Sequence, residues 1–400
     1  MRRFLLAALV GTLVLSATAP AMARHAPASA KSAKASVTAA QPAKQAPDLR
    51  VGLASGRASL TITPAEGKAT AQTESSKTIA LAANTAAAIR WQAGAFLVGR
   101  EKLRGDVLTI RPSGAGELAL DGRRYRGALE LRHKSGGLTA VNIVPVDDYL
   151  RSVVPEEMPV DWPAEAIKAQ SVAARSFALA SRGRHASEGY DLCTTTHCQL
   201  YTGTAAEKSA SNAAIKATRG EVLTYGGKPI EALFHTDSGG MTENSEDVWG
   251  SRIPYLRAAR EVYANTQPWD KNITAADFCT LLAKHGKSLG TLKTITLSPL
   301  TDERNAPDRT VSGRVRMVRL EGTNGTLQVS GNDLRSWLGL RSTMFQMTLR
   351  NDVVFITGYG WGHGLGLSQW GAKAFADAKH MSYPDILAHY YAGTVLKKLY

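Results

Sequence analysis

An alanine-rich run, PAEAIKAQSVAARSFALASR at 163–182, constrains the fold of this chain more than any other segment. Its apolar and small residues recur at helical spacing. One face of the expected helix consists of Ile167, Ser171, Ala174 and Ala178. Asp161 precedes the run as a possible N-cap, and Gly183 follows its end. Because small side chains let another backbone approach closely, the run predicts a helix against which other elements pack.

The first 23 residues have the three parts of a secretory signal peptide. Met-Arg-Arg gives a basic start, residues 4–17 are mostly apolar, and Ala-Met-Ala at 21–23 is a small-x-small cleavage site. Residues 24–48 have almost no large apolar side chains and predict a flexible tether. No later apolar run is long enough to cross a bilayer. We therefore expect an exported protein of the periplasm or cell envelope, without a transmembrane span after signal cleavage.

The chain is basic, with a formal net charge of +14 over 400 residues, and the charge is spread along the sequence. Because an exported protein leaves the compartment that holds nucleic acid, we expect no nucleic-acid partner. Anionic cell-wall polymers or a membrane surface fit the charge better. Basic residues that only favour solubility are an equally good explanation.

The pattern of apolar residues changes near residue 144. Residues 49–143 contain short apolar runs separated by glycine and serine turns, which predicts a β-rich region. Residues 144–400 mix strand-like runs at 220–225 and 230–235 with helix-like runs at 275–285 and 383–391. There is no regular alternation of strands and helices and no internal repeat. The sequence therefore predicts an α+β fold, in which a β-rich N-terminal region precedes a mixed α/β core.

Two adjacent carboxylates, Glu156 and Glu157, lie between prolines and apolar residues in SVVPEEMP at 152–159. We expect this segment to be extended, so that at most one of the two side chains faces a given cleft. A carboxyl in apolar surroundings keeps its proton near neutral pH and can act as an acid in glycosidic bond cleavage. A simple turn explains the same pattern.

Two histidines and two cysteines fall within fourteen residues: His185, Cys193, His197 and Cys198. They suffice for a tetrahedral zinc site, which would be structural because no coordination position stays open. A disulfide between Cys193 and Cys198 is the competing prediction in an exported protein. The total of three cysteines, with Cys279, leaves at least one thiol unpaired or differently used.

Glycine alternates with other residues in GYGWGHGLGLSQWG at 358–371. An extended strand of this pattern would have one bare face, with Tyr359, Trp361 and His363 on the other. Aromatic rings beside exposed backbone amides suit a flat sugar ring. Close packing of the bare face against the alanine-rich helix is an alternative, and both interpretations are compatible.

Other hydrolytic sites fit the sequence less well. Ser238 lies near His235, but Ser-Gly-Gly lacks the pattern of a nucleophile elbow. A metal-dependent amidase would need His235, His363 or His389 as ligands, and none of these lies in a local ligand motif. We therefore favour neither class.

Several segments, in this order, resemble one family: DDYLRSVVPEEMPVDWPAEAIKAQSVAARSFAL, YDLCTTTHCQLYTG, ATRGEVLTYGGKPIEALFHTDSGGMTENSEDVWG, PYLR, GYGWGHGLGLSQWGA and an ILAHYYAGT-like tail. They resemble the stage II sporulation protein D family, whose domain is shared with amidase-enhancer (LytB) proteins. The resemblance covers residues 144–400. It implies a lytic transglycosylase that cleaves the bond between N-acetylmuramic acid and N-acetylglucosamine in peptidoglycan.

The resemblance also assigns residues. The catalytic acid of the family falls on Glu157, its important arginine on Arg175, and its Tyr-x-basic pair on Tyr255 and Arg257, where arginine replaces the usual lysine. The metal-binding version of the Cys-His segment falls on His185, Cys193, His197 and Cys198. The remaining residues expected to bind substrate are Ser238, Gly239, Trp361, His363 and Gln369.

The implied mechanism uses one carboxyl twice. Glu157 protonates the glycosidic oxygen and then, as a base, helps the muramic C6 hydroxyl close on C1 to give a 1,6-anhydro end. Arg175 and Arg257 would hold substrate carboxylates, such as the lactyl group of peptide-stripped strands. A cell-wall amidase that strips the peptides is then the expected partner. The rival expectation is a non-catalytic wall-binding protein that enhances an N-acetylmuramoyl-L-alanine amidase.

Overall fold

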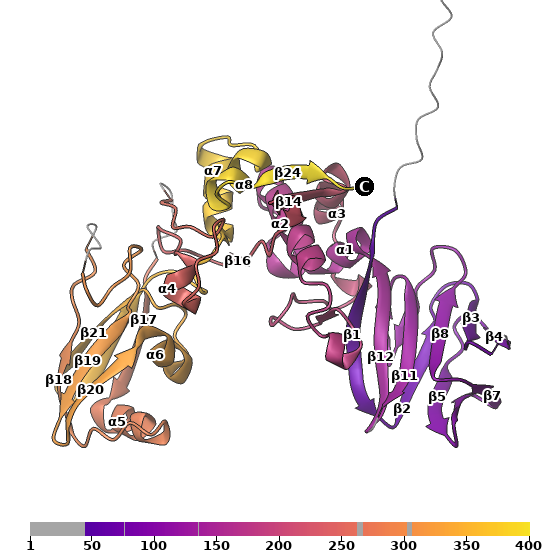
Figure 1. Cartoon of the computed structure of the whole chain (residues 1–400), viewed down its shortest axis with the longest axis horizontal. Helices are drawn as coiled ribbons and strands as arrows, with labels where there is room; N and C mark the ends of the chain where they lie inside the picture. The colour runs from indigo at the N-terminus through magenta and orange to yellow at the C-terminus, as the bar shows by residue number, and fades with distance from the viewer. Residues whose placement is uncertain (1–44, 76, 135, 262–266, 302–305) are drawn as a thin grey trace, which may run out of the picture. The chain divides into compact units, whose positions relative to one another are not determined.

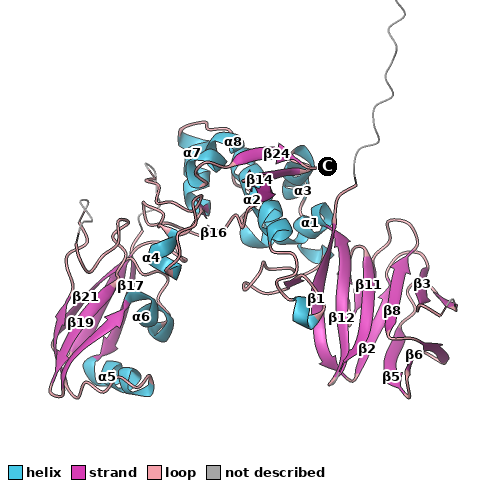
Figure 2. Cartoon of the chain, viewed as in Figure 1, coloured by secondary structure: helices cyan, strands magenta, loops and turns pink. Residues whose placement is uncertain are grey.

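The computed structural model describes residues 45–400, except for 76, 135, 262–266 and 302–305. The expected signal peptide at 1–23 lies outside the described residues, as does the expected tether apart from residues 45–48. The described residues combine helices with several sheets, and strands dominate before Pro145 (Figure 2). This confirms the α+β class with a β-rich N-terminal region. Among the described helices, none is both long enough and apolar enough to pass through a bilayer.

Two sheets form the N-terminal region, shown in indigo to purple in Figure 1, and the strands before Val146 pair antiparallel in both. On strand β2, buried Leu60 and Ile62 alternate with exposed residues, while β11 and β12 are buried at consecutive positions. The strands of the first sheet that precede Val146 are β1 (Asp48–Arg57), β3 (Ala69–Gln72), β4 (Thr78–Leu81), β8 (Val107–Pro112), β11 (Ala128–Lys134) and β12 (Gly137–Pro145). The second consists of β2 (Ser59–Pro64), β5 (Ala87–Gln92), β6 (Ala95–Val98), β7 (Glu101–Arg104), β9 (Leu118–Leu120) and β10 (Arg123–Tyr125).

The first sheet has a late strand at its edge. Strand β13 (Leu192–Cys193) pairs in parallel with β1, which places Leu192 beside Val51 and Cys193 beside Gly52. The Cys-His segment is therefore anchored on the N-terminal region by backbone pairing.

The alanine-rich run forms helix α2 (Ala164–Ala180), which confirms the predicted helix. Every residue from Ala169 to Ala178 is buried, because α2 packs against several elements. These elements are α1 (Val146–Glu157), α3 (Ser209–Ala217), α7 (Gln369–Ala378), α8 (Tyr383–Tyr390), β14 (Glu221–Tyr225) and β15 (Lys228–Pro229). The expected cap at Asp161 is not formed: Pro163 occupies the N-cap position without a side-chain hydrogen bond.

The acidic pair lies on a helix, so the expectation of an extended segment was wrong. Helix α1 includes Pro155 in its last turn and ends at Glu157. The next residue, Met158, adopts an extended conformation. Proline removes one backbone hydrogen bond of a helix, and this late position makes the loss tolerable. Adjacent helical residues are about 100° apart around the axis. Glu156 is consequently exposed while Glu157 is half-buried.

A second hydrophobic core lies within residues 269–358, which we call the second-core unit. Its sheets have the orders β17-β22-β21 and β18-β19-β20, and α5 and α6 pack beside them (Figure 1, orange). The elements are β17 (Trp269–Thr274), α5 (Ala275–Lys284), β18 (Leu292–Thr296), β19 (Met317–Gly322), β20 (Gly325–Ser330), α6 (Gly331–Leu338), β21 (Phe345–Arg350) and β22 (Val353–Gly358). The chain returns to the first core through α7, α8 and β24 (Val395–Lys398), which pairs with β14.

The glycine-rich segment is not the expected long strand. Strand β22 ends at Gly358, and the glycines at 360, 362, 364 and 366 have φ angles of 72°, 116°, 85° and 67°. Such left-handed backbone is accessible to glycine at little cost. At Gly362 a Cβ atom would also lie 2.7 Å from the Cβ of His235. The segment therefore forms a loop that approaches neighbouring backbone closely, before β23 (Leu367–Ser368) pairs with β16 (Phe234–His235).

Candidate functional site

A cavity of about 530 Å³ contains four of the residues predicted to catalyse the reaction or bind substrate, and we call it the Glu157 cavity. They are Glu157, Trp361, His363 and Gln369. Residues from the Cys-His segment and from the second-core unit also line it. Cavities of about 760 and 970 Å³ are bounded by other residues, with Asp148 in one wall and Glu156 in the other. Neither of them contains Glu157 or the glycine-rich segment.

Glu157 ends helix α1, and its surroundings favour the protonated carboxyl. Burial raises the pKa of Glu157, and the nearby charge of Glu156 raises it further. The backbone N–H of Leu200 donates to Glu157 Oε1 at 3.1 Å and opposes this shift. On balance the pKa of Glu157 is raised from the ordinary value of a glutamate, which is the direction that favours a general acid.

Glu156 points to a different surface. Its Oε1 accepts a hydrogen bond from Thr202 Oγ1 at 3.0 Å, and it lines the 970 Å³ cavity. The segment after Cys198 is fixed against α1, since Ser152 Oγ accepts from the backbone N–H groups of Thr202 and Gly203 at 3.0 Å each. The two adjacent acids are thus separated by the geometry of the helix, and only Glu157 lines the cavity that bears its name.

Two histidines lie beside each other in the cavity wall, with ring centroids 5.5 Å apart. His235 Nδ1 lies 3.1 Å from the carbonyl oxygen of Leu365, so it must carry the proton and donate. His363 Nδ1 accepts from the N–H of the same Leu365 at 2.9 Å, so its proton is on Nε2. His235 Nε2 is buried and has no hydrogen-bond partner among the described residues. It is a free acceptor in a wall of the cavity.

Both imidazoles are neutral at physiological pH. Burial lowers the pKa of His235 well below its usual value, and repulsion from His363 adds to the effect. Burial likewise lowers the pKa of His363 to about 4, while a hydrogen bond with the Phe234 backbone opposes the shift. Neither ring therefore contributes a positive charge next to a bound substrate.

Aromatic side chains provide stacking surfaces around the opening. Trp361 is 52% exposed and Trp249 is 49% exposed, which is unusual for tryptophan. The Trp249 ring centroid lies 6.3 Å from that of His363, and Arg341 lies over the Trp361 ring at 4.8 Å. Gln369, the first residue of α7, is buried at the cavity wall. Exposed rings next to polar groups suit the apolar face of a sugar.

Two arginines line the cavity and differ in their partners. Arg184 forms an ion pair with Glu231 at 2.6 Å. Arg335, from α6 of the second-core unit, forms no ion pair with any described carboxylate. Glu231 is the other carboxylate of the lining, and its pairing with Arg184 leaves Glu157 as the lining acid without a cationic partner in the described chain.

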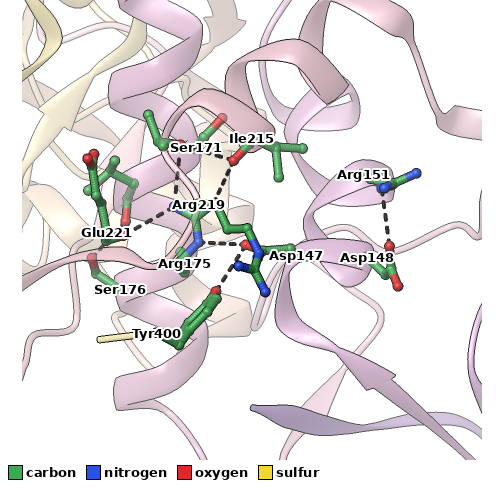
Figure 3. Close-up of polar contacts among 12 residues, drawn as sticks. Asp147, Asp148, Arg151, Ser171, Arg175, Ser176, Ile215, Arg219, Glu221 and Tyr400 are labelled. Atoms are coloured by element: carbon green, nitrogen blue, oxygen red, sulfur yellow. Dashed lines mark hydrogen bonds and ion pairs between the residues drawn. The ribbon is translucent and has the colours of Figure 1, made fainter. Parts of the chain in front are cut away.

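Arg175, expected to bind substrate, is fully buried and does not line the Glu157 cavity; Figure 3 shows its polar contacts. Its Nε donates to Asp147 Oδ1 at 2.9 Å, and its terminal nitrogens donate to the backbone carbonyls of Glu221 and Ile215 at 3.1 and 3.3 Å. Its donors are engaged between α1, α2 and α3, so direct contact with a substrate does not fit this position. Arg175 instead fixes α1, which carries Glu157 at its other end.

The other predicted substrate-binding residues lie outside the cavity lining. Arg257 is paired with Glu246, and the Tyr255 ring lies 5.8 Å from that of Tyr225. Ser238 is buried and donates to Glu261 Oε2 at 2.7 Å, while burial raises the pKa of Glu261 to about 7. Gly239, with a φ of 72°, lies close to the backbone of Tyr359 and Gly360. Ser238 and Gly239 therefore support the glycine-rich loop from behind.

The four residues of the Cys-His segment converge. One ligand atom from each of His185, Cys193, His197 and Cys198 lies within 4.8 Å of the others. His185 Nε2 is 3.4 Å from Cys198 Sγ, and His197 Nδ1 is 3.7 Å from both sulfurs. Both cysteines are free thiols. The set fits a tetrahedral zinc ion with two sulfur and two nitrogen ligands.

Neighbouring groups orient these ligands. His185 Nδ1 lies 2.6 Å from Glu188 Oε1, an arrangement in which a carboxylate fixes the ring of a metal-binding histidine. The backbone N–H of Cys193 donates to Cys198 Sγ at 3.4 Å. Because His197 and Cys198 also line the Glu157 cavity, the cluster supports one of its walls.

Sequence reasoning missed several lining residues, among them Glu231, Trp249 and Arg335. Trp249 is the last residue of helix α4 (Ser245–Trp249) and lies near the end of a segment that carries the family resemblance, which was the available signal. Glu231 lies in a segment that carries the family resemblance but has no signal of its own, and Arg335 lies in a segment without a recognisable motif. They reach the cavity only through the tertiary fold.

Comparisons with known proteins agree with the family resemblance. Residues 134–225 match the SpoIID family, described as stage II sporulation protein, and residues 257–366 match a domain of unknown function, DUF8618. Stage II sporulation protein D of Bacillus subtilis (strain 168) is 32% identical over 283 residues, 65% of this chain and 76% of that protein. The protein of the same name from Bacillus amyloliquefaciens is 35% identical over 271 residues, 64% of this chain and 74% of that protein.

The amidase enhancer of Bacillus subtilis (strain 168) is 31% identical over 346 residues, 74% of this chain. The aligned region is 47% of the amidase enhancer, so this chain spans about half of that longer protein. The DUF8618 match covers most of the second-core unit, and its description assigns no function to this region. Together, the matched segments and the coverage of these relatives show that the chain belongs to the stage II sporulation protein D family.

Proposed function

We propose that the protein is a lytic transglycosylase that cleaves peptidoglycan strands between N-acetylmuramic acid and N-acetylglucosamine. The single observation that carries this proposal is the placement of Glu157: a carboxyl with a raised pKa in a cavity walled by tryptophans and neutral histidines. Leaving-group protonation needs an acid that is still protonated near pH 7. The exposed rings of Trp249 and Trp361 suit an extended glycan.

In the proposed reaction, the proton of Glu157 moves to the glycosidic oxygen as the bond to the muramic C1 breaks. The resulting carboxylate then accepts the proton of the C6 hydroxyl while that oxygen bonds to C1, which closes the 1,6-anhydro ring. One carboxyl serves both steps, and Glu157 is restored to its protonated form. A mechanism with one carboxyl fits this cavity, because its other carboxylate, Glu231, is paired with Arg184.

We further propose that His185, Cys193, His197 and Cys198 hold a structural zinc ion, because their four ligand atoms lie within 4.8 Å of one another. Four protein ligands leave no open position, so the ion would supply stability and no chemistry. It would hold the loop that precedes Leu200, whose N–H donates to Glu157. The proposed cellular place is the periplasm or cell envelope, where the glycan substrate is located.

The second candidate function is non-catalytic enhancement of a cell-wall amidase, which the match to an amidase enhancer favours. The two functions differ in their products. Purified protein, incubated without any amidase on peptide-stripped glycan strands, should release fragments with 1,6-anhydro ends detectable by mass spectrometry. Intact strands after this incubation, combined with faster peptide release when an amidase is added, would favour the enhancer instead.

A further inference from the structure

Arg335 brings a positive charge from the second-core unit into the Glu157 cavity. It lies on helix α6, and it lines the cavity together with His363 and Trp249. The same three residues also line a shallower depression of the neighbouring surface. The catalytic acid, by contrast, comes from α1 in the first core. The cavity therefore contains groups from two separately packed parts of the chain.

The charge of Arg335 is not neutralised within the described part of the protein. Burial lowers the pKa of Arg335, and no described acidic side chain forms an ion pair or hydrogen bond with its guanidinium. Several other arginines around the site are paired with carboxylates: Arg184 with Glu231, Arg257 with Glu246, Arg316 with Asp247, and Arg175 with Asp147. A partly desolvated guanidinium without a partner is costly, and an incoming anion would offset that cost.

The groups facing Arg335 do not supply such an anion. His363 and His235 are neutral, and Trp249 presents an aromatic ring. A carboxylate is the natural ligand of a guanidinium because two parallel N–H···O bonds can form. The substrate itself can provide one, if the proposed function is correct: each muramic acid carries a lactyl carboxylate that is free only when the stem peptide is absent.

We infer that Arg335 binds the lactyl carboxylate of a peptide-free muramic acid in the Glu157 cavity, and that the second-core unit thereby selects stripped strands. This inference rests on the proposed function. Arg335 thereby takes the role that the sequence predicted for Arg175 and Arg257, which is to bind a substrate carboxylate. Unlike theirs, its guanidinium is not engaged by a described carboxylate. A stem peptide converts the carboxylate into an amide, which removes the charge and adds bulk at this position.

The test measures binding without turnover, in protein that carries Glu157→Gln. Isothermal titration compares peptide-free strands that have free lactyl carboxylates with the same strands after conversion of the carboxylates to methylamides. We expect the free form to bind about 10- to 100-fold more tightly, the usual range for a charge-assisted pair. Adding Arg335→Gln should remove this preference by weakening only the free form.

Arg350→Gln is the matched control, since it removes the same charge from an exposed position in the same unit. It should leave the preference intact. Equal affinity of the parent for both strand forms would overturn the inference, as would an equal loss for both forms in Arg335→Gln. A reduced melting temperature accompanied by that equal loss would identify a structural role. The proposed function is tested separately, with protein that retains Glu157. If that protein releases no 1,6-anhydro ends, the proposed function fails.

Discussion

His235 and His363 are held in opposite tautomers by the two backbone groups of one residue. The carbonyl of Leu365 accepts from His235 Nδ1, and the N–H of Leu365 donates to His363 Nδ1. The glycine-rich loop thus presents a free acceptor, His235 Nε2, in the wall of the cavity that contains the proposed acid. Glycines at 364 and 366, both with positive φ, give the loop the shape that brings Leu365 to both rings.

The first prediction concerns these tautomers. Nitrogen-15 spectra should show His235 protonated at Nδ1 and His363 at Nε2, with both rings neutral at pH 7. His235→Asn keeps a donor for Leu365 and should fold normally but bind glycan more weakly. His235→Leu leaves the Leu365 carbonyl without its donor and should cost about 1–3 kcal/mol of unfolding free energy. A charged imidazolium at either position at pH 7 would refute the assignment.

The second prediction concerns Arg175, which we place in the support of α1. Arg175→Ala leaves Asp147 without its buried partner and should lower the unfolding free energy by about 3–5 kcal/mol in urea denaturation. Arg219→Ala is the control, since Arg219 also approaches Asp147, at 3.7 Å, but is 46% exposed. It should cost less than about 1 kcal/mol. Unchanged stability of Arg175→Ala with lost activity would instead place Arg175 in the chemistry.

The third prediction concerns the proposed zinc. Elemental analysis of the purified protein should give one zinc per chain, and a chelator should lower the melting temperature. Cys198→Ser should reduce both the zinc content and the melting temperature, because it removes one of four ligands. Cys279→Ser, in the second-core unit, should change neither. A metal-free protein with a Cys193–Cys198 disulfide would contradict the proposal.

The fourth prediction concerns pH. Activity should decline as pH rises through the raised pKa of Glu157, because only the protonated carboxyl can donate. The charge of Glu156 contributes to this raised pKa. Glu156→Gln should therefore shift the alkaline side of the pH–rate profile to lower pH without abolishing the reaction. A profile that does not move in this variant would remove Glu156 from the electrostatics of the site.

The sequence predicts elements of this fold where periodicity or composition is strong. Helix α2 is within two residues of its predicted ends, since its small residues permit burial on every side. The convergence of His185 with Cys198 follows from their closeness in the chain and from a short loop. These features are local, and local patterns specify them.

Other features depend on backbone choices or on distant packing. Prolines around Glu156 and Glu157 suggested an extended segment, but a helix tolerates Pro155 in its last turn. Alternating glycines suggested a strand, although glycine equally allows the left-handed loop that forms here. Arg335 follows Glu157 by 178 positions and lies in a different core, so only the tertiary fold brings them to one cavity.

The most direct test of the central claim uses the two adjacent glutamates as a matched pair. Each is changed to glutamine, and the release of 1,6-anhydro ends from peptide-stripped strands is measured by mass spectrometry. Glu157→Gln should lower the rate by at least about 100-fold, the usual contribution of a general acid, while glycan binding persists. Glu156→Gln should retain most of the rate at its own optimum pH. Parental release by Glu157→Gln would contradict the account.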